Sequence, residues 1–278
     1  MKQSICHYSY HRTWEKRRWS CDDLAAAVKS LGVGAVDFHV RYLGDPDTAA
    51  GRIRAAIDRF ELELSGISLS NNLNHSDEQK LEEEIAATVR WIRLAAEVEA
   101  PVSRIFGGHI QDRSDIKALN SGFERIVDGL GQISAQAKKY GVLLALENHG
   151  GLPCTAEEQI DVVRKINSEH LRATVDIGNY LGCGQDPVDA CAISAPYAAY
   201  VHVKDFVKKK SDRTPWGWIL ESAILGAGAV DVPGCLGELK RAGYGGYVAL
   251  EYEAPSDEER GVSESVEYLS SVLDGVES

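Results

Sequence analysis

The sequence predicts a single (β/α)8 barrel, the TIM-barrel fold, over residues 1–278. Three observations lead to this fold class. Short apolar runs alternate eight times with longer amphipathic stretches, and such alternation implies parallel strands covered by helices. Eight units in about 250 residues match the size of a closed barrel. No linker, low-complexity segment or shift in composition divides the chain, so we expect one domain.

The expected strands are apolar runs of five to ten residues, a length that suits buried parallel strands. They cover residues 4–8, 35–40, 64–69, 102–106, 142–151 with a polar end, 171–179, 199–206 and 247–253. A doubly wound open sheet is the alternative. Its usual Gly-x-Gly-x-x-Gly fingerprint is missing after the first strand, which favours the barrel.

Capping signals mark the helices between these strands. Ser20, Ser76 and Thr155 are predicted N-caps, and Glu158 completes a capping box with Thr155. Gly141 follows a long helix, where a residue in the left-handed conformation is needed. Helices are expected over 20–31, 47–62, 76–99, 114–140, from 155, from 187, over 232–242 and over 257–273. Residues 9–19 are expected to form a loop, and residues 208–229 a long insertion.

Polar side chains gather where the expected strands end. In a barrel the carboxyl ends of all strands face one mouth, where active sites occur. The polar residues at these ends are His7, His39, Asn71, Asn72, His109, Glu147, Asp176, His202 and Glu251. The opposite ends carry little beyond helix-ending glycine and proline. We therefore predict a functional site at the mouth.

Four of these residues form a candidate metal-ligand set: Glu147, Asp176, His202 and Glu251. Taken singly, each carboxylate is as readily a structural ion-pair partner, and His202 is more readily a core histidine. Together, buried carboxylates that share one mouth must be paired with cations or neutralised. Few arginines occur at these strand ends, so a metal ion would meet the need. Three carboxylates and one imidazole favour Mn²⁺, Mg²⁺ or Co²⁺.

The period of two along a strand predicts a second tier of side chains at the mouth. If Glu147 points inward, His149 does too, and Lys204 likewise accompanies His202. Both are expected to contact a substrate above the metal, although a loop histidine and a surface lysine remain equally simple interpretations. Trp14 lies in a mouth loop, where an aromatic face suits a sugar ring, and ordinary loop packing explains it as well.

The composition limits the function classes. A net charge of −12 and a pI near 5.2 argue against a broad nucleic-acid surface. No apolar run reaches the length of a membrane span, and the first residues lack the apolar core of a secretory signal. Six scattered cysteines without a Cys-x-x-Cys pair predict reduced thiols in a cytoplasmic protein. A homo-oligomer stays open.

Motifs at the later strands resemble those of the sugar phosphate isomerase/epimerase superfamily, the xylose-isomerase-like barrels. The resemblance rests on ALENH, TVDIGN, HVKD and GYVALEYE, and on a GAGAVD turn before the last of these. It covers essentially the whole chain, though the first half matches only in pattern. It implies one divalent metal on the four residues named above, with Glu147 and Glu251 as an acid/base pair that acts through an enediolate.

His7 and His39 at the strand ends, Trp14 in its loop, and Asn179 three residues after Asp176 are also expected to contact substrate. Two positions depart from the pattern of ketose 3-epimerases. Asn179 stands where these enzymes often carry a histidine, and Lys208 where they often carry an arginine. These departures argue against a free ketohexose and leave inososes, keto-glycosides, other polyols or a phosphosugar open.

The sequence thus predicts a metal-dependent isomerase or epimerase of a carbohydrate or polyol-type small molecule. A lyase or dehydratase acting on a keto-sugar or inosose is the alternative, because an enolate can also expel a β-hydroxyl group. An endonuclease-like hydrolase fits the acidic composition poorly. A non-catalytic partner subunit would have little need of a complete set of ligands.

Overall fold

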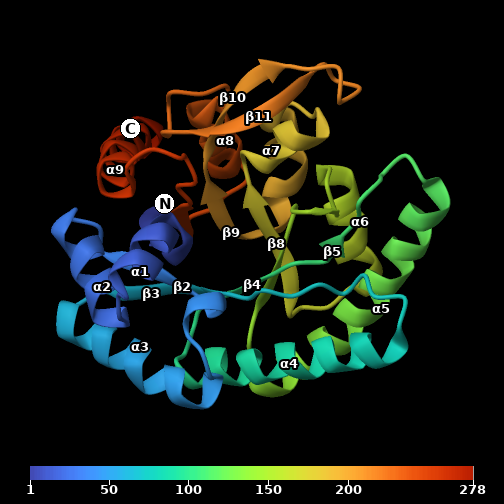
Figure 1. Ribbon diagram of the computed structural model, residues 1–278, viewed down its shortest axis with the longest axis horizontal. Coiled ribbons are helices and arrows are strands. Elements are labelled where there is room, and N and C mark those ends of the chain that lie inside the picture. The colour runs from blue at the N-terminus through green and yellow to red at the C-terminus, as the bar shows by residue number, and fades with distance from the viewer. Residues whose placement is uncertain (278) are drawn as a thin grey trace.

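The computed structural model describes residues 1–277 and contains a closed barrel of parallel strands (Figure 1). The strands follow one another round the barrel in chain order, and the first closes against the last. They are β1 (Lys2–Cys6), β2 (Ala35–His39), β3 (Glu63–Ser68), β4 (Ser103–Ile105), β6 (Leu144–Glu147), β8 (Leu171–Asp176), β9 (Ala198–Val203) and β12 (Tyr247–Leu250). The predicted (β/α)8 barrel is confirmed.

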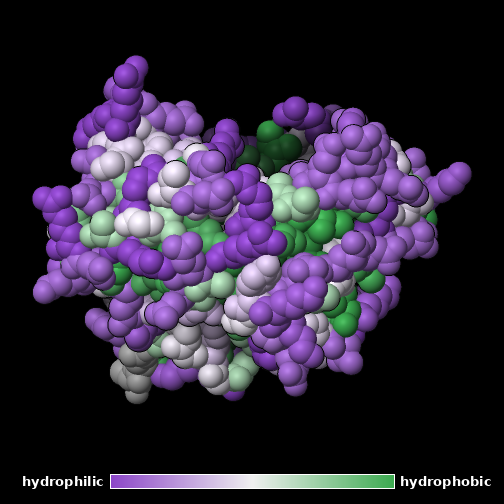
Figure 2. Space-filling view, turned by 90° about the horizontal axis from the view of Figure 1, so that it is seen from below, coloured by the Kyte–Doolittle hydropathy of each residue, from purple (hydrophilic) through white to green (hydrophobic). Residues whose placement is uncertain are grey.

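Apart from the first short helix, which follows β1 at the mouth, helices surround the barrel and cover the outer faces of its strands (Figure 1). They are α1 (His11–Arg17), α2 (Cys21–Ser30), α3 (Pro46–Phe60), α4 (Glu78–Glu97), α5 (Ile116–Tyr140), α6 (Ala156–Ile166), α7 (Pro187–Ser194), α8 (Val232–Arg241) and α9 (Glu258–Glu277). Their apolar stripes and the strands form one large buried core. On the face seen in Figure 2, hydrophilic residues cover most of the surface. Within residues 1–277, no helix is both long and apolar enough to cross a membrane.

The capping predictions hold at three helices and fail at one. Ser20 and Thr155 form the capping boxes of α2 and α6, and Gly141 ends α5 with a φ of +70°. For α4, Asp77 rather than Ser76 is the N-cap, because its carboxylate accepts the backbone N–H groups of Gln79 and Lys80. An ionised carboxylate also suits the positive end of the helix dipole.

Two segments expected to be irregular are ordered. Residues 9–19 contain the end of a 3-10 turn, η1 (His7–Tyr10), and helix α1, whose seven residues include no glycine or proline. The insertion forms an antiparallel hairpin of β10 (Asp205–Lys210) and β11 (Trp218–Ala223). Two short strands, β5 (Gly108–His109) and β7 (Gly151–Leu152), pair at the mouth. The remaining 3-10 turns are η2 (Val40–Tyr42), η3 (Asn179–Cys183) and η4 (Ala195–Tyr197).

Several strands are shorter than expected at their carboxyl ends. The run over 199–206, for example, divides into β9 and the start of β10. The Asp205 carboxylate explains the division, since it accepts the backbone N–H groups of Gly226, Gly228 and Val230 in the turn that follows the hairpin. The chain therefore leaves the barrel immediately after Lys204, which keeps that side chain at the mouth.

Candidate active site

Four barrel strands bring the predicted ligand set together. Glu147 ends β6, Asp176 ends β8, His202 lies in β9, and Glu251 directly follows β12. One ligand atom from each lies within 4.8 Å of the others, and all four residues are buried. The parallel register accounts for this, because Asp176 and His202 are direct partners on neighbouring strands. The structure thus brings together the four residues that the sequence singled out.

The free atoms of this cluster suit a cation. The backbone N–H groups of Gly178 and Asn179 donate to one oxygen of Asp176, Oδ1. The other oxygen, Oδ2, makes no hydrogen bond, and neither do Glu147 Oε2 and His202 Nδ1. Buried polar atoms normally have hydrogen-bond partners, so these clustered atoms, two of which only contact the cations Lys204 and Arg104, are available as ligands. Three carboxylates and an imidazole could hold one divalent metal ion there.

Lys204 supplies one positive charge to the cluster. Its Nζ lies 2.5 Å from Glu251 Oε2, 3.0 Å from Asp176 Oδ2 and 2.9 Å from Glu253 Oε1. Burial by itself would lower the lysine pKa, but Asp176 and Glu251 outweigh it and raise the pKa well above its usual range. Gly178 makes room for this side chain, since a Cβ there would lie 2.7 Å from the lysine Cγ.

Arg104 supplies a second positive charge, which the sequence analysis missed. It lies in β4, is almost fully buried, and places Nε 3.0 Å from Glu147 Oε2. Its Nη1 donates to the Leu69 carbonyl at 2.7 Å, and the guanidinium lies 4.0 Å from the centre of the Phe106 ring. In the sequence, Arg104 could have been noticed as a single arginine inside an apolar run that was predicted to be a strand. The expectation that arginines are scarce at these strand ends is therefore wrong at Glu147.

The two glutamates have opposite electrostatic environments. Burial raises the pKa of Glu147 well above its usual range, and Arg104 opposes that shift only in part. Burial also opposes the charge on Glu251, but Lys204 outweighs it, so the pKa of Glu251 is lowered. Asp176 and His202 lie on the two strands between these glutamates. Burial raises the pKa of Asp176 to about 7 and lowers that of His202 to about 3.

Two further predicted residues lie beside the cluster on the β6 side. Asn179, in η3, donates from Nδ2 to Glu147 Oε1 at 3.2 Å, so it contacts the carboxylate itself. His149 follows Glu147 by two residues and stacks on Phe106, with 4.3 Å between ring centres. Its Nδ1 is buried without a hydrogen bond, and burial lowers its pKa to about 3. Neutral His149 thus presents an unpaired nitrogen near the site.

His7, His39 and Trp14 form a separate aromatic group above β1 and β2. His7 is fully buried, 4.2 Å from the Trp14 ring and 4.8 Å from the Tyr42 ring between centres. His39 is buried near Tyr42, and its Nδ1 accepts the backbone N–H of Arg41. In this structure Trp14 covers His7, so of these two residues only Trp14 is partly exposed.

The cysteine expectation is wrong for one pair. Cys154 and Cys183 form a disulfide, whereas Cys6, Cys21, Cys191 and Cys235 are free and buried. Cys154 lies in the loop between β7 and α6, and Cys183 ends η3. These loops follow neighbouring barrel strands, so folding brings together residues that are 29 positions apart. Sequence spacing alone gave no sign of this pairing.

A surface cavity of about 1000 Å³ lies elsewhere, between α5 and the turn over residues 166–170. This turn precedes β8, so the cavity lies toward the amino ends of the strands. It contains none of the clustered carboxylates, and the candidate site therefore remains the mouth.

The fold and site define a TIM barrel with a candidate metal centre at its carboxyl-end mouth. Residues 25–272 match the model of the xylose isomerase-like TIM barrel family. The match spans most of the chain, and the protein belongs to this family. The expected resemblance is confirmed at this level.

Two curated relatives match part of the chain. The rhizopine catabolism protein MocC of Rhizobium meliloti is 28% identical over 132 residues, which are 45% of this chain and 41% of that protein. The inosose dehydratase of Geobacillus kaustophilus is 24% identical over 195 residues, which are 66% of this chain and 61% of that protein. The matched stretches thus span about two fifths and three fifths of these relatives.

Two solved structures share the fold over nearly the whole chain. A D-tagatose 3-epimerase-like protein superposes with a TM-score of 0.78 at 20% identity, covering 100% of this chain and 98% of that one. A xylose isomerase-like TIM barrel protein of Mycobacterium smegmatis, in complex with magnesium, gives a TM-score of 0.71 at 18% identity, covering 92% and 88%. At these identities the likeness concerns the fold.

Proposed function

We propose that this protein is a divalent-metal-dependent enzyme that isomerises or epimerises a carbohydrate or polyol-type substrate through an enediolate. The observation that carries the proposal is the convergence of Glu147, Asp176, His202 and Glu251, whose facing atoms include three without hydrogen bonds. The metal is Mn²⁺, Mg²⁺ or Co²⁺, and the magnesium complex of the Mycobacterium smegmatis protein supports that choice. When bound, the ion polarises substrate oxygens and acidifies the neighbouring C–H bond.

Glu147 and Glu251 act as the acid/base pair. Their strands, β6 and β12, are three steps apart round the barrel, so the two carboxylates approach the mouth from different sides. Asn179 and Arg104 hold Glu147, and Lys204 holds Glu251.

The remaining residues position the substrate. His149 and Lys204 orient substrate oxygens above the metal. Trp14, which packs on His7 and Tyr42, and His39, which lies near Tyr42, provide an aromatic wall for the sugar or polyol carbon frame. The substrate is a small molecule rather than a nucleic acid, in keeping with the net charge of −12.

A dehydratase acting on a keto-sugar or inosose is the second candidate. The buried Lys204 ammonium favours it, because a cation beside Glu251 can stabilise the negative charge on a departing hydroxyl group. The inosose dehydratase of Geobacillus kaustophilus also supports this alternative. Both reactions begin with removal of a proton next to a carbonyl group, so they share the roles of Glu147 and Glu251.

Solvent isotope exchange tests the proposal. Ketoses, keto-glycosides and inososes are incubated in D₂O with the metal-loaded protein, and deuterium at the carbon next to the carbonyl is measured by mass spectrometry and NMR. We expect exchange, and a loss of about 10²-fold or more in Glu147→Gln and in Glu251→Gln. Glu253→Gln is the matched control, since Glu253 also contacts Lys204 but lies outside the ligand set.

The products separate the two candidates. Isomerisation or epimerisation keeps the mass of the substrate apart from deuterium, whereas dehydration removes water and creates an absorbing enone. Full retention of the original hydrogen during turnover would point to hydride transfer. Undiminished exchange in both glutamine variants would remove these residues from the chemistry.

A further inference from the structure

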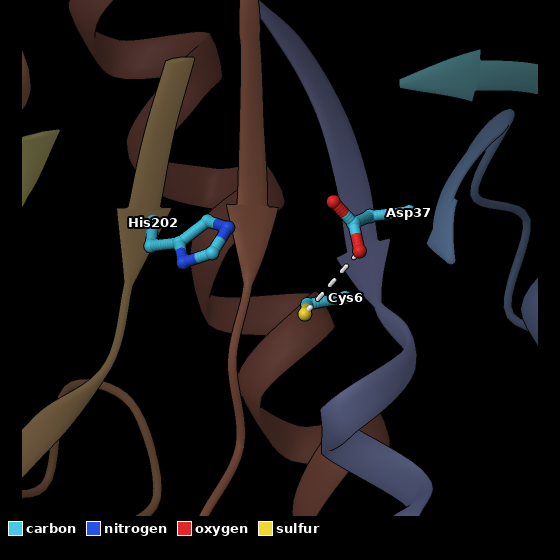
Figure 3. A group of neighbouring side chains, drawn as sticks. All are labelled: Cys6, Asp37 and His202. Atoms are coloured by element: carbon cyan, nitrogen blue, oxygen red, sulfur yellow. Dashed lines mark hydrogen bonds between the residues drawn. The ribbon is translucent and has the colours of Figure 1, made fainter. Parts of the chain in front are cut away.

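A second buried cluster lies beside the candidate metal centre and is formed by Cys6, Asp37 and His202 (Figure 3). One ligand atom from each lies within 4.8 Å of the others, and all three residues are fully buried. Cys6 ends β1 and Asp37 lies in β2, where the register makes them direct partners. His202 reaches the same space from β9, so this residue belongs to both clusters.

The surroundings of Asp37 fix its carboxylate and leave one oxygen available. Oδ2 accepts from Ser68 Oγ at 2.8 Å and from the Tyr200 hydroxyl at 3.2 Å. Oδ1 accepts only the thiol of Cys6, at 3.7 Å, within the described residues. A Cβ on Gly66 would lie 3.2 Å from Oδ2, so the glycine leaves space for the carboxylate. Asp37 is thus held in place through Oδ2, while Oδ1 has only a long contact with a thiol.

The imidazole of His202 has its two nitrogens on different sides. Nδ1 lies 3.5 Å from Glu147 Oε2 and 3.8 Å from Glu251 Oε2. The ring turns its other nitrogen, Nε2, toward Cys6 and Asp37 (Figure 3). Neither nitrogen makes a hydrogen bond, although the residue is fully buried. Nδ1 thus faces the two glutamates and could offer a lone pair. Nε2 faces Cys6 and Asp37 and could donate an N–H.

A neutral imidazole carries one N–H and one lone pair, and its partners decide which nitrogen has which. A metal ligand needs the lone pair on the nitrogen that faces the metal. The other nitrogen then carries the proton, and this N–H usually donates to a carboxylate or carbonyl that fixes the tautomer and the ring orientation. In this chain the carboxylate on that side is Asp37.

We propose that Asp37 is a positioning residue for His202: its carboxylate, which lies near Nε2 without a hydrogen bond in this structure, favours the tautomer with the proton on Nε2 and so directs the Nδ1 lone pair toward the ion held by Glu147, Asp176 and Glu251. Ser68 and Tyr200, which donate to Oδ2, hold this carboxylate in place. The effect on metal binding rests on the proposed metal-dependent function. The tautomer and its dependence on Asp37 can be measured without any metal.

The test combines NMR with metal titration. Protein labelled with ¹⁵N-histidine gives the tautomer of His202 from long-range ¹⁵N–¹H correlations, with His202→Gln for assignment, in the metal-free and the Mg²⁺-loaded state. We expect the Nε2–H form in both. Asp37→Leu should lose this preference and bind Mn²⁺ about 10–100-fold more weakly. Asp37→Asn keeps the shape and a carbonyl acceptor, so it should fold and largely retain both properties.

The control is Ser68→Ala, which removes one of the two donors to Asp37 Oδ2 and keeps the Asp37 carboxylate beside His202. It should bind Mn²⁺ like the unaltered protein. An Nδ1–H tautomer, or unchanged tautomer and metal affinity in Asp37→Leu, would overturn the inference. So would two equivalents of Co²⁺ with a thiolate-to-cobalt charge-transfer band, because Cys6 and Asp37 would then bind metal themselves. If no metal binds but the Nε2–H form depends on Asp37, the positioning role stands and the proposed metal function fails.

Discussion

Arg104 Nε lies 3.0 Å from Glu147 Oε2 inside the barrel, and both side chains are almost completely shielded from solvent. A buried carboxylate that loses its ion-pair partner is strongly penalised, because water does not replace the lost partner. Lys204 contacts Asp176, Glu251 and Glu253 instead. The Arg104–Glu147 pair therefore stabilises the buried glutamate in the metal-free protein.

Arg104→Met should lower the free energy of unfolding of the metal-free protein by about 3–5 kcal/mol. Saturating Mn²⁺ should recover part of the loss, since a bound cation compensates the charge of Glu147. Urea unfolding with and without Mn²⁺ measures both effects. Arg172→Met is the control, because Arg172 also lies on a barrel strand but is exposed. If both variants lose the same free energy of unfolding, the buried pair contributes no more to stability than an exposed arginine.

The barrel and the ligand set could be predicted because each depends on a local pattern. Glu147, Asp176 and Glu251 each end a short apolar run, and parallel strands carry such ends to one mouth. Arg104 was harder to place, because a charged residue inside an apolar run does not reveal its partner. The Cys154–Cys183 disulfide could not be predicted at all, because it depends on two loops that meet only after neighbouring strands pair.

The inner cluster shows the same limit. Cys6 and Asp37 occur in runs that were correctly predicted to be strands, but neither run indicates which residue will lie opposite it. Their relationship to His202 depends on barrel closure, which places β1 next to β12 and near β9. Local sequence thus indicates which residues can do chemistry, whereas the closed sheet decides which of them meet.

Lys204→Met should separate substrate handling from metal binding. The substitution keeps the length of the side chain and removes the charge that now contacts Asp176 and Glu251. These carboxylates should then bind Mn²⁺ as tightly as before or more tightly, while kcat/KM falls by about 10²-fold or more. Calorimetric titration and steady-state kinetics measure the two quantities. Lys209→Met is the control, since Lys209 is exposed on the β10–β11 hairpin. Loss of the metal in Lys204→Met would show that the lysine is required for the site itself.

His7 should make the stability of the protein depend on pH. The residue is fully buried between aromatic rings, and neither of its ring nitrogens makes a hydrogen bond. Burial lowers its pKa from the ordinary 6.5 to about 3. The folded state therefore holds His7 neutral, whereas the unfolded chain takes up a proton near pH 6.5. The stabilisation is complete above that pH and is lost as the pH falls toward 3.

We therefore expect His7→Phe to resist acid better than the unaltered protein. Each pH unit below 6.5 should cost the unaltered protein about 1.4 kcal/mol that the variant does not lose, or roughly 3 kcal/mol at about pH 4.5. Urea unfolding between about pH 7 and pH 4.5 measures the difference in slope. Tyr42→Phe changes a ring of the same group without removing the histidine, so its slope should match that of the unaltered protein. Parallel slopes for His7→Phe and the unaltered protein would mean that His7 takes up its proton in the folded state as readily as in the unfolded chain.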